Sequence, residues 1–287
     1  MNTAIQHPAI FPDSIRQTSQ EALDNPQRKK SAADWLPRYT GMPLELFRKH
    51  ILLTNFHQYV EMFAKRFDAQ VYGMATPDSF ARNMQAASSD DMTIINLGIG
   101  GPAAAIVMDL LSAVAPEAAL FLGKCGGVKH DMSLGELILP TAAIRGDGAS
   151  RNYLPPEVPA LPAFALQKAV ADTIQAEGKK CWSGPVFTTD VRMWEWNELY
   201  KDYLRSVRAL AVDMETATLF SLGFFNKIPT GALLLVSDLP MTEAGIKTEA
   251  SDKEVSRSFV GSHLDLGLSA MQRIIQSRES VRHLKTW

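Results

Sequence analysis

Short, continuous runs of apolar residues alternate along most of the chain with longer stretches whose apolar residues recur at helical spacing. The runs predict strands at 51–54, 92–97, 118–122, 136–140, 141–144 and 184–189, and two more that begin at Leu210 and Leu233. The helical spacing predicts helices at 43–50, 57–67, 103–114, 163–176 and, near the C-terminus, 251–283. Apolar strands that alternate with helices are typical of a parallel sheet covered on both faces. We therefore predict a three-layer α/β/α fold with a mixed, mostly parallel central sheet.

The first part of the chain differs from the rest. Residues 1–34 are polar and mixed, and we expect an irregular arm with one short helix. We divide the chain into a partly helical N-terminal arm, residues 1–40, and a single domain over residues 41–287. A chain of 287 residues is long enough for one large α/β domain with such an extension.

The composition argues against several classes of protein, among them proteins that bind nucleic acid or anionic membranes through their overall charge. Lys and Arg number 29 against 31 Asp and Glu, so no overall field attracts nucleic acid or an anionic membrane. The 2 cysteines form no CxxC pair and the 6 histidines have no metal-ligand spacing, so we expect neither a disulfide framework nor a bound metal. With no signal peptide and no apolar run of membrane-spanning length, a cytoplasmic location is the expectation.

Carboxylates follow two of the predicted strands. Asp213 and Glu215 come after the strand at Leu210, and Asp238 ends the strand at Leu233. In open α/β sheets, ligands bind outside the carboxyl ends of the strands. Two such carboxylates suit the cleavage of a nucleoside's glycosidic bond, where one holds vicinal hydroxyls and the other handles a proton. The alternative is that these acids only favour helix N-termini and cap strand ends.

Two glycine-rich segments follow other strands. Residues 98–103 fit a relaxed dinucleotide fingerprint, but the next strand ends at Lys124 and not at the acidic residue that would hold a ribose. We expect a tight turn facing a small ligand, and no cofactor. In residues 123–127, Cys125 is a candidate nucleophile, but His130 is the only histidine close in sequence, which favours a buried structural thiol.

In order and spacing, five segments resemble the nucleoside phosphorylase and nucleosidase superfamily: 98–102, 123–127, 145–150, 213–215 and 237–238. Five further segments resemble the AMP nucleosidases within it: 36–41, 51–60, 189–195, 212–218 and 245–247. The resemblance implies a short form that lacks the large N-terminal regulatory domain of longer members. It also implies a homo-oligomer, built from dimers into a hexamer, with a small nucleotide as substrate.

The resemblance implies roles for individual residues. Asp238 would be the general acid at purine N7, and burial should raise its pKa. Glu215 would accept hydrogen bonds from the ribose 2′- and 3′-hydroxyls, with Met214 against the sugar. The other implied substrate-binding residues around the sugar and the base are Gly100, Gly126, Thr189, Asp190, Arg192 and Ser237.

The chain departs from the superfamily's phosphorylases at two positions. Arginines that bind the phosphate nucleophile are replaced by Tyr59, with Gln58 beside it, and by Phe121. Without two guanidinium groups, bidentate capture of phosphate is weak, which favours water as the nucleophile. Asn55 and His57 lie in the segment where water would be activated, although His57 also fits a surface or interface position.

A substrate 5′-phosphate needs cations, and the candidates are Lys124, Arg145, Lys247 and Arg38. Each could instead be a solvated surface cation. The leading function is hydrolysis of AMP to adenine and ribose 5-phosphate. The alternatives are phosphorolysis of purine nucleosides or uridine, hydrolysis of other nucleoside monophosphates, and a non-catalytic nucleotide sensor.

Overall fold

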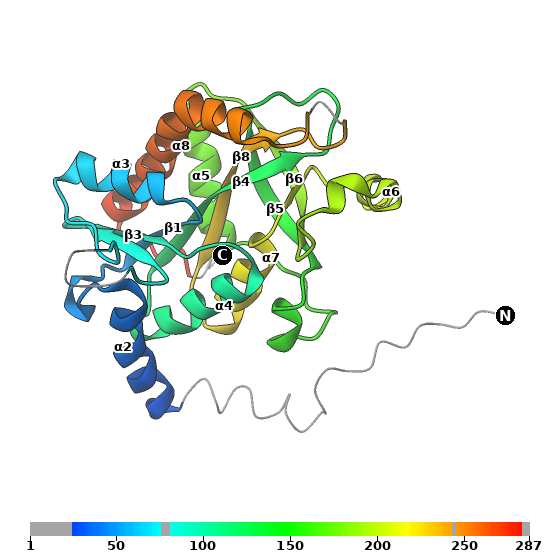
Figure 1. The fold of residues 1–287 in the computed structure, drawn as a ribbon. Coiled ribbons are helices and arrows are strands. Elements are labelled where there is room, and N and C mark those ends of the chain that lie inside the picture. The colour runs from blue at the N-terminus through cyan, green and yellow to red at the C-terminus, as the bar shows by residue number, and fades with distance from the viewer. Residues whose placement is uncertain (1–24, 76–80, 243–244, 283–287) are drawn as a thin grey trace, which may run out of the picture.

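The computed structural model describes residues 25–75, 81–242 and 245–282 (Figure 1). Within them, eight strands form one sheet in the order β2-β3-β1-β4-β7-β6-β5-β8. The strands are β1 (His50–Thr54), β2 (Gln85–Ser88), β3 (Met92–Asn96), β4 (Ala118–Gly127), β5 (Leu137–Gly146), β6 (Cys181–Thr189), β7 (Ala211–Asp213) and β8 (Thr230–Asp238).

Most pairings in this sheet are parallel. β1 pairs in parallel with β3 and β4, β4 with β8, and β6 with β5 and β7. The pairings β2–β3, β4–β7 and β5–β8 are antiparallel. Because β4 pairs with β8 as well as with β7, the strands β4, β7, β6, β5 and β8 close into a ring. The predicted mixed, mostly parallel sheet is confirmed.

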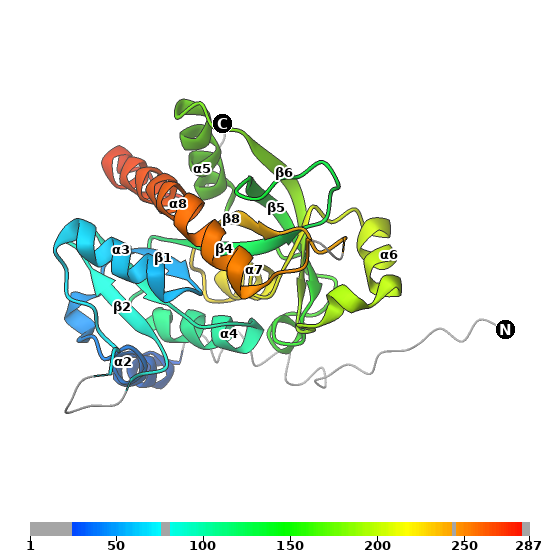
Figure 2. The same ribbon diagram turned by 45° about the horizontal axis from the view of Figure 1, so that its top comes forward.

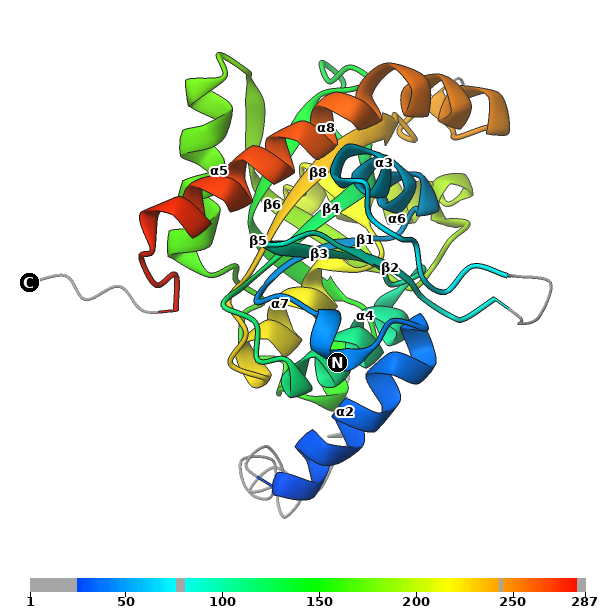
Figure 3. The ribbon, with the colours of Figure 1, turned by 90° about the vertical axis from the view of Figure 1, so that its left-hand side faces the viewer.

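Helices cover both faces of the sheet. On one face lie α3 (His57–Phe67), α5 (Phe164–Ala176) and α8 (Glu249–Ser277), and on the other α2 (Pro26–Thr40), α4 (Gly101–Leu110) and α7 (Thr216–Phe225), as Figure 3 shows. Successive side chains of β1 point to opposite faces of the sheet. Leu52 packs against the layer of α3 and α8, and Ile51 and Leu53 pack against the layer of α4 and α7. The predicted three layers are confirmed. The short α6 (Glu198–Ser206) lies beside β6 at the margin of the sheet (Figure 2).

Several predicted elements have other bounds. The helix predicted over residues 43–50 is wrong: only a single 3-10 turn, Leu44–Leu46, forms before β1 begins at His50. α2 is longer than the short helix expected in the arm, whose residues 1–24 lie outside the described part of the chain. The glycine-rich segment 123–127 continues β4. No helix among the described residues is long and apolar enough to cross a membrane.

Candidate active site

The carboxyl ends of β1, β4, β6, β7 and β8 surround a cavity of about 240 Å³. Most of the residues predicted for the site line it: Asn55, Lys124, Gly126, Thr189, Arg192, Met214, Glu215, Ser237, Asp238 and Lys247. The cavity therefore lies at the carboxyl ends of the strands, where ligands bind in open α/β sheets.

Asp213 ends β7 as a buried and fully bonded carboxylate. Its Oδ1 accepts a hydrogen bond from Thr188 Oγ at 2.6 Å. Its Oδ2 accepts from Thr216 N at 2.7 Å, from Thr216 Oγ at 2.5 Å and from Glu215 N at 3.2 Å. These bonds fix the turn from β7 into α7. Asp213 thereby positions Glu215 and has little capacity left for a ligand.

Glu215 is buried beside this turn and faces the glycine-rich loop. The Gly100 N–H donates to its Oε1 at 2.7 Å, and the Asn55 side chain also donates to the carboxyl. Gly100 can aim its N–H this way because it adopts φ +93°, a region that favours glycine. Burial, and after it the charge of Asp213, raises the pKa of Glu215 to about 8.

Asp238 ends β8 on another side of the cavity. Burial raises the pKa of its carboxyl, although a hydrogen bond from Ser237 and the charges of Lys247 and Arg192 act in the opposite direction. Ser237 Oγ donates to Asp238 Oδ1 at 2.7 Å. Gly126 lets the carboxyl lie close to β4, since a Cβ there would be 3.0 Å from Asp238 Oδ2. Asp238 is thus a buried acid whose protonated form is favoured.

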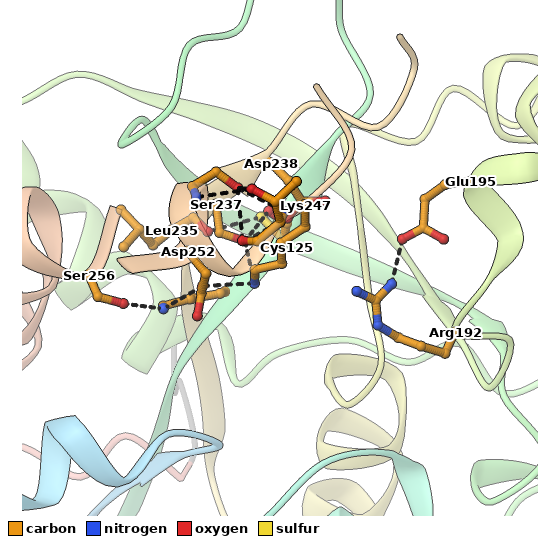
Figure 4. Close-up of polar contacts among 12 residues, drawn as sticks. Cys125, Arg192, Glu195, Leu235, Ser237, Asp238, Lys247, Asp252 and Ser256 are labelled. Carbon is orange, nitrogen blue, oxygen red and sulfur yellow. Dashed lines mark hydrogen bonds and ion pairs between the residues drawn. The ribbon is translucent and has the colours of Figure 1, made fainter. Parts of the chain in front are cut away.

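Two lysines contact the carboxylate of Asp252. Figure 4 shows one of them, Lys247, next to Ser237 and Asp238. Lys124 Nζ lies 3.0 Å and Lys247 Nζ 3.1 Å from Asp252 Oδ1, near the start of α8. Lys124 also donates to Ser256 Oγ at 2.8 Å, and Lys247 to Ser237 Oγ at 3.2 Å. Two cations against one carboxylate leave a local positive charge.

The segment that follows β6 also lines the cavity. Thr189 exchanges a hydrogen bond of 2.7 Å with the Tyr200 hydroxyl, and its Oγ accepts from Val191 N. Arg192 Nη1 lies 2.5 Å from Glu195 Oε1. Glu195 was not among the predicted site residues. The sequence did contain a signal for Glu195: it lies three positions after Arg192, in the segment 189–195 that resembles the family.

Some predicted residues lie outside the cavity lining. Gly100 acts through its N–H bond to Glu215. Asp190 accepts a hydrogen bond from Gly148 N at 2.6 Å, and His57 is exposed at the start of α3. Arg38, considered for the phosphate, is exposed on α2.

Arg145 is not placed to bind a phosphate. Its guanidinium donates to the backbone carbonyls of Ser150, Leu154, Pro155 and Val158 at 2.6–2.9 Å, and to Ser150 Oγ at 3.0 Å. These five bonds use its donors. Arg145 therefore holds the loop after β5 in place, and the expectation of a phosphate ligand here is corrected.

The two positions predicted to lack phosphate-binding arginines lie in the core. Tyr59 is fully buried in α3, and its hydroxyl donates to His263 Nδ1 at 2.8 Å. His263 Nε2 donates in turn to the Leu233 carbonyl of β8 at 3.0 Å. Phe121 is fully buried in β4, and its ring fills the space over Gly123. Neither side chain lines the cavity.

A sequence model of the Phosphorylase superfamily matches residues 49–277. AMP nucleosidase of Escherichia coli K12 is 27% identical over 88% of this chain and 60% of its own length, so the chain spans about three fifths of that relative. Guanosine phosphorylase of Halorubrum lacusprofundi is 32% identical over 58% of this chain and 68% of its own. The crystal structure of AMP nucleosidase from Bacteroides thetaiotaomicron matches with a TM-score of 0.75 and 45% identity, over 88% of this chain and 99% of that one.

Replacing Arg145 should destabilise the protein. In Arg145→Met, the loop carbonyls lose their donors, and we expect the free energy of unfolding to fall by about 2–4 kcal/mol in a denaturant titration. Arg38→Met is the matched control, since Arg38 is exposed on α2. Equal unfolding midpoints for the two variants would contradict the structural role of Arg145.

Proposed function

The chain belongs to the phosphorylase superfamily, and on that premise we propose that it hydrolyses the N-glycosidic bond of AMP, releasing adenine and ribose 5-phosphate. The observation that carries this proposal is one cavity shared by a buried acid, Asp238, a sugar-facing carboxyl, Glu215, and the two cations Lys124 and Lys247. Such a set matches the base, the ribose and the phosphate of a nucleotide. The two relatives named AMP nucleosidase support the same substrate.

Asp238 would act on the leaving base. As the C1′–N9 bond breaks, its electron pair passes to the purine, and a proton given to N7 makes the departing adenine neutral. An acid for this step must hold its proton near neutral pH, and burial favours the protonated carboxyl of Asp238. Ser237, which donates to Asp238 Oδ1, leaves the other oxygen, Oδ2, to carry the proton toward the base.

Glu215 and Met214 would hold the ribose. The carboxyl is fixed by Gly100 N–H and Asn55, so it can accept from the 2′- and 3′-hydroxyls without reorganising. The sugar becomes positively charged as the base leaves, and that charge favours the ionised form of Glu215. Met214 lines the cavity next to this carboxyl and offers an adaptable apolar surface to the sugar ring.

Water would be the nucleophile. The arginines expected for inorganic phosphate are replaced by Tyr59 and Phe121, which are both buried in the core. Asn55 Oδ1 lies at the cavity, buried and without a hydrogen-bond partner among the described residues. Since its amide group donates to Glu215, the free oxygen of Asn55 can accept a hydrogen bond from a water close to the ribose.

The 5′-phosphate would bind at Lys124 and Lys247. The side chains of Lys124, from β4, and Lys247, from the loop before α8, both reach Asp252 in the first turn of α8, a long helix whose positive end favours anions. Asp252 neutralises only part of their charge. Lys247 follows β8 on a loop, and it can exchange Ser237 or Asp252 for a phosphate oxygen.

Product analysis tests the reaction. The pure protein should convert AMP to adenine and ribose 5-phosphate at the same rate with and without inorganic phosphate. Adenosine serves as the parallel substrate that lacks the 5′-phosphate. Ribose 1-phosphate formed from adenosine, and only when phosphate is present, would identify a phosphorylase and overturn the proposal.

Asp238→Asn should remove the general acid. We expect kcat/KM for AMP to fall by about 10²–10⁴-fold, the usual contribution of a positioned acid. In the unaltered protein, the pH profile of kcat/KM should include a decline as pH rises through the elevated pKa of Asp238, because the ionised form has no proton to give. A decline on the acid side belongs to Glu215, which acts in its ionised form. The residual activity of the variant should lack the alkaline decline. The control is Asp202→Asn on the exposed side of α6, and an alkaline decline that persists in Asp238→Asn would assign the acid elsewhere.

Lys247→Met should weaken binding of the phosphate group. Loss of one charge-assisted hydrogen bond predicts an increase in KM for AMP of about 10- to 100-fold. The turnover of adenosine, measured in the same assay, should change much less. Lys253→Met, which removes an exposed lysine of α8 paired with Glu249, is the matched control. Equal losses for AMP and adenosine would mean that Lys247 acts on Asp238 and not on the phosphate.

A further inference from the structure

We propose that Glu195 reads the purine base and selects a 6-amino group over a 6-oxo group; this inference rests on the proposed function and assigns the source of its base preference. Glu195 belongs to the 3-10 turn Trp194–Trp196 after β6 and lines the cavity with Arg192. It would be a specificity-determining residue.

The two oxygens of the Glu195 carboxylate have different surroundings. Oε1 is paired with Arg192 Nη1 at 2.5 Å. Oε2 is buried and has no hydrogen-bond partner among the described residues, and the whole residue is only 3% exposed. A buried carboxylate oxygen without a donor is costly, and such groups usually receive one. Because Oε2 belongs to a residue that lines the cavity, a ligand is the natural source of that donor.

The position of Glu195 relative to Asp238 identifies the kind of donor. Figure 4 shows the Arg192–Glu195 pair on one side and Asp238, with Ser237 and Lys247, on the other. In a purine, N7 and the substituent at C6 lie on the same edge, so a base that presents N7 to Asp238 presents its C6 substituent to a neighbouring group. Adenine carries an N–H donor at that position, and guanine or hypoxanthine carries a carbonyl acceptor.

The charge of the Glu195 carboxylate determines whether the site prefers a 6-amino or a 6-oxo base. A carboxylate paired with a guanidinium accepts hydrogen bonds but has no proton to donate. Glu195 Oε2 therefore accepts from the 6-amino group of adenine and repels a 6-oxo group. Arg192 alone would favour the opposite choice, because a guanidinium is a donor. The two residues thus make opposite predictions, which permits a clean test.

The test compares AMP with IMP, which has the same ribose phosphate but a 6-oxo base. We expect kcat/KM to favour AMP by at least 100-fold in the unaltered protein. Glu195→Gln keeps the shape of the side chain but can turn an N–H toward the base. It should lower kcat/KM for AMP at least tenfold while that for IMP stays constant or rises. Glu198→Gln, an exposed neighbour in α6 paired with Lys201, should change neither value.

A ratio of AMP to IMP that Glu195→Gln leaves unchanged would overturn the proposal. Calorimetric binding of the free bases adenine, purine and hypoxanthine to the unaltered protein provides a second measurement that needs no variant and no turnover. Adenine should bind at least tenfold more tightly than purine, which lacks the amino group, and hypoxanthine more weakly than either. Equal binding of adenine and hypoxanthine would also overturn the role of Glu195. If this order holds but AMP is not cleaved, the proposed hydrolysis fails and the base selection stands.

Discussion

The hydrogen bonds to Asp213 fix the positions of β6, β7 and the start of α7 relative to one another at the cavity. One buried carboxylate receives donors from Thr188 on β6 and from Thr216 and Glu215 at the start of α7, so it joins strands and a helix at the cavity floor. Burial raises the pKa of Asp213, and these donors offset only part of that increase. The charge of the Asp213 carboxylate also acts on its neighbour. Glu215, buried next to Asp213, therefore has a raised pKa and depends on the N–H of Gly100. Asp213 thus affects Glu215 in two ways, through the turn that positions its side chain and, after burial, through the charge that raises its pKa.

The remaining charges are divided between two ends of the cavity. Lys124 and Lys247 gather at α8, and the Arg192–Glu195 pair stands after β6. Both groups act on the pKa of Asp238: the charges of Lys247 and Arg192 lower it, and the charge of Glu195 raises it. Burial raises this pKa, and the nearby cations reduce that increase without cancelling it. Under the proposed function, the lysines that bind the substrate's phosphate oppose protonation of the acid, and burial is the larger effect at Asp238.

The strands and the carboxylates at their ends could be predicted from the sequence because both are local signals: a continuous apolar run, and an acid directly after it. Features that depend on contacts with residues far away in the sequence could not be predicted. Arg145 resembled a free cation in the sequence, and only the folded loop shows that backbone carbonyls use its donors. The helix predicted at 43–50 does not continue past Leu46, because Phe47 is extended and the Arg48 N–H donates to the Thr93 hydroxyl of β3. Glu195 Oε2, which has no hydrogen-bond partner among the described residues, belongs to the turn after β6, and only the folded structure shows that this turn lines the cavity.

The choice between water and phosphate as nucleophile is connected to the core of the protein. Tyr59 is at one position predicted to lack a phosphate-binding arginine, and its hydroxyl forms a chain of hydrogen bonds through His263 to the Leu233 carbonyl, which connects α3 and α8 to β8. Phe121 is at the other predicted position and fills the space that Gly123 leaves open in β4. An arginine at either position would bury a charge among apolar neighbours and lose these contacts. Under the proposed function, hydrolysis is therefore a property of how the layers pack and not only of the residues that line the cavity.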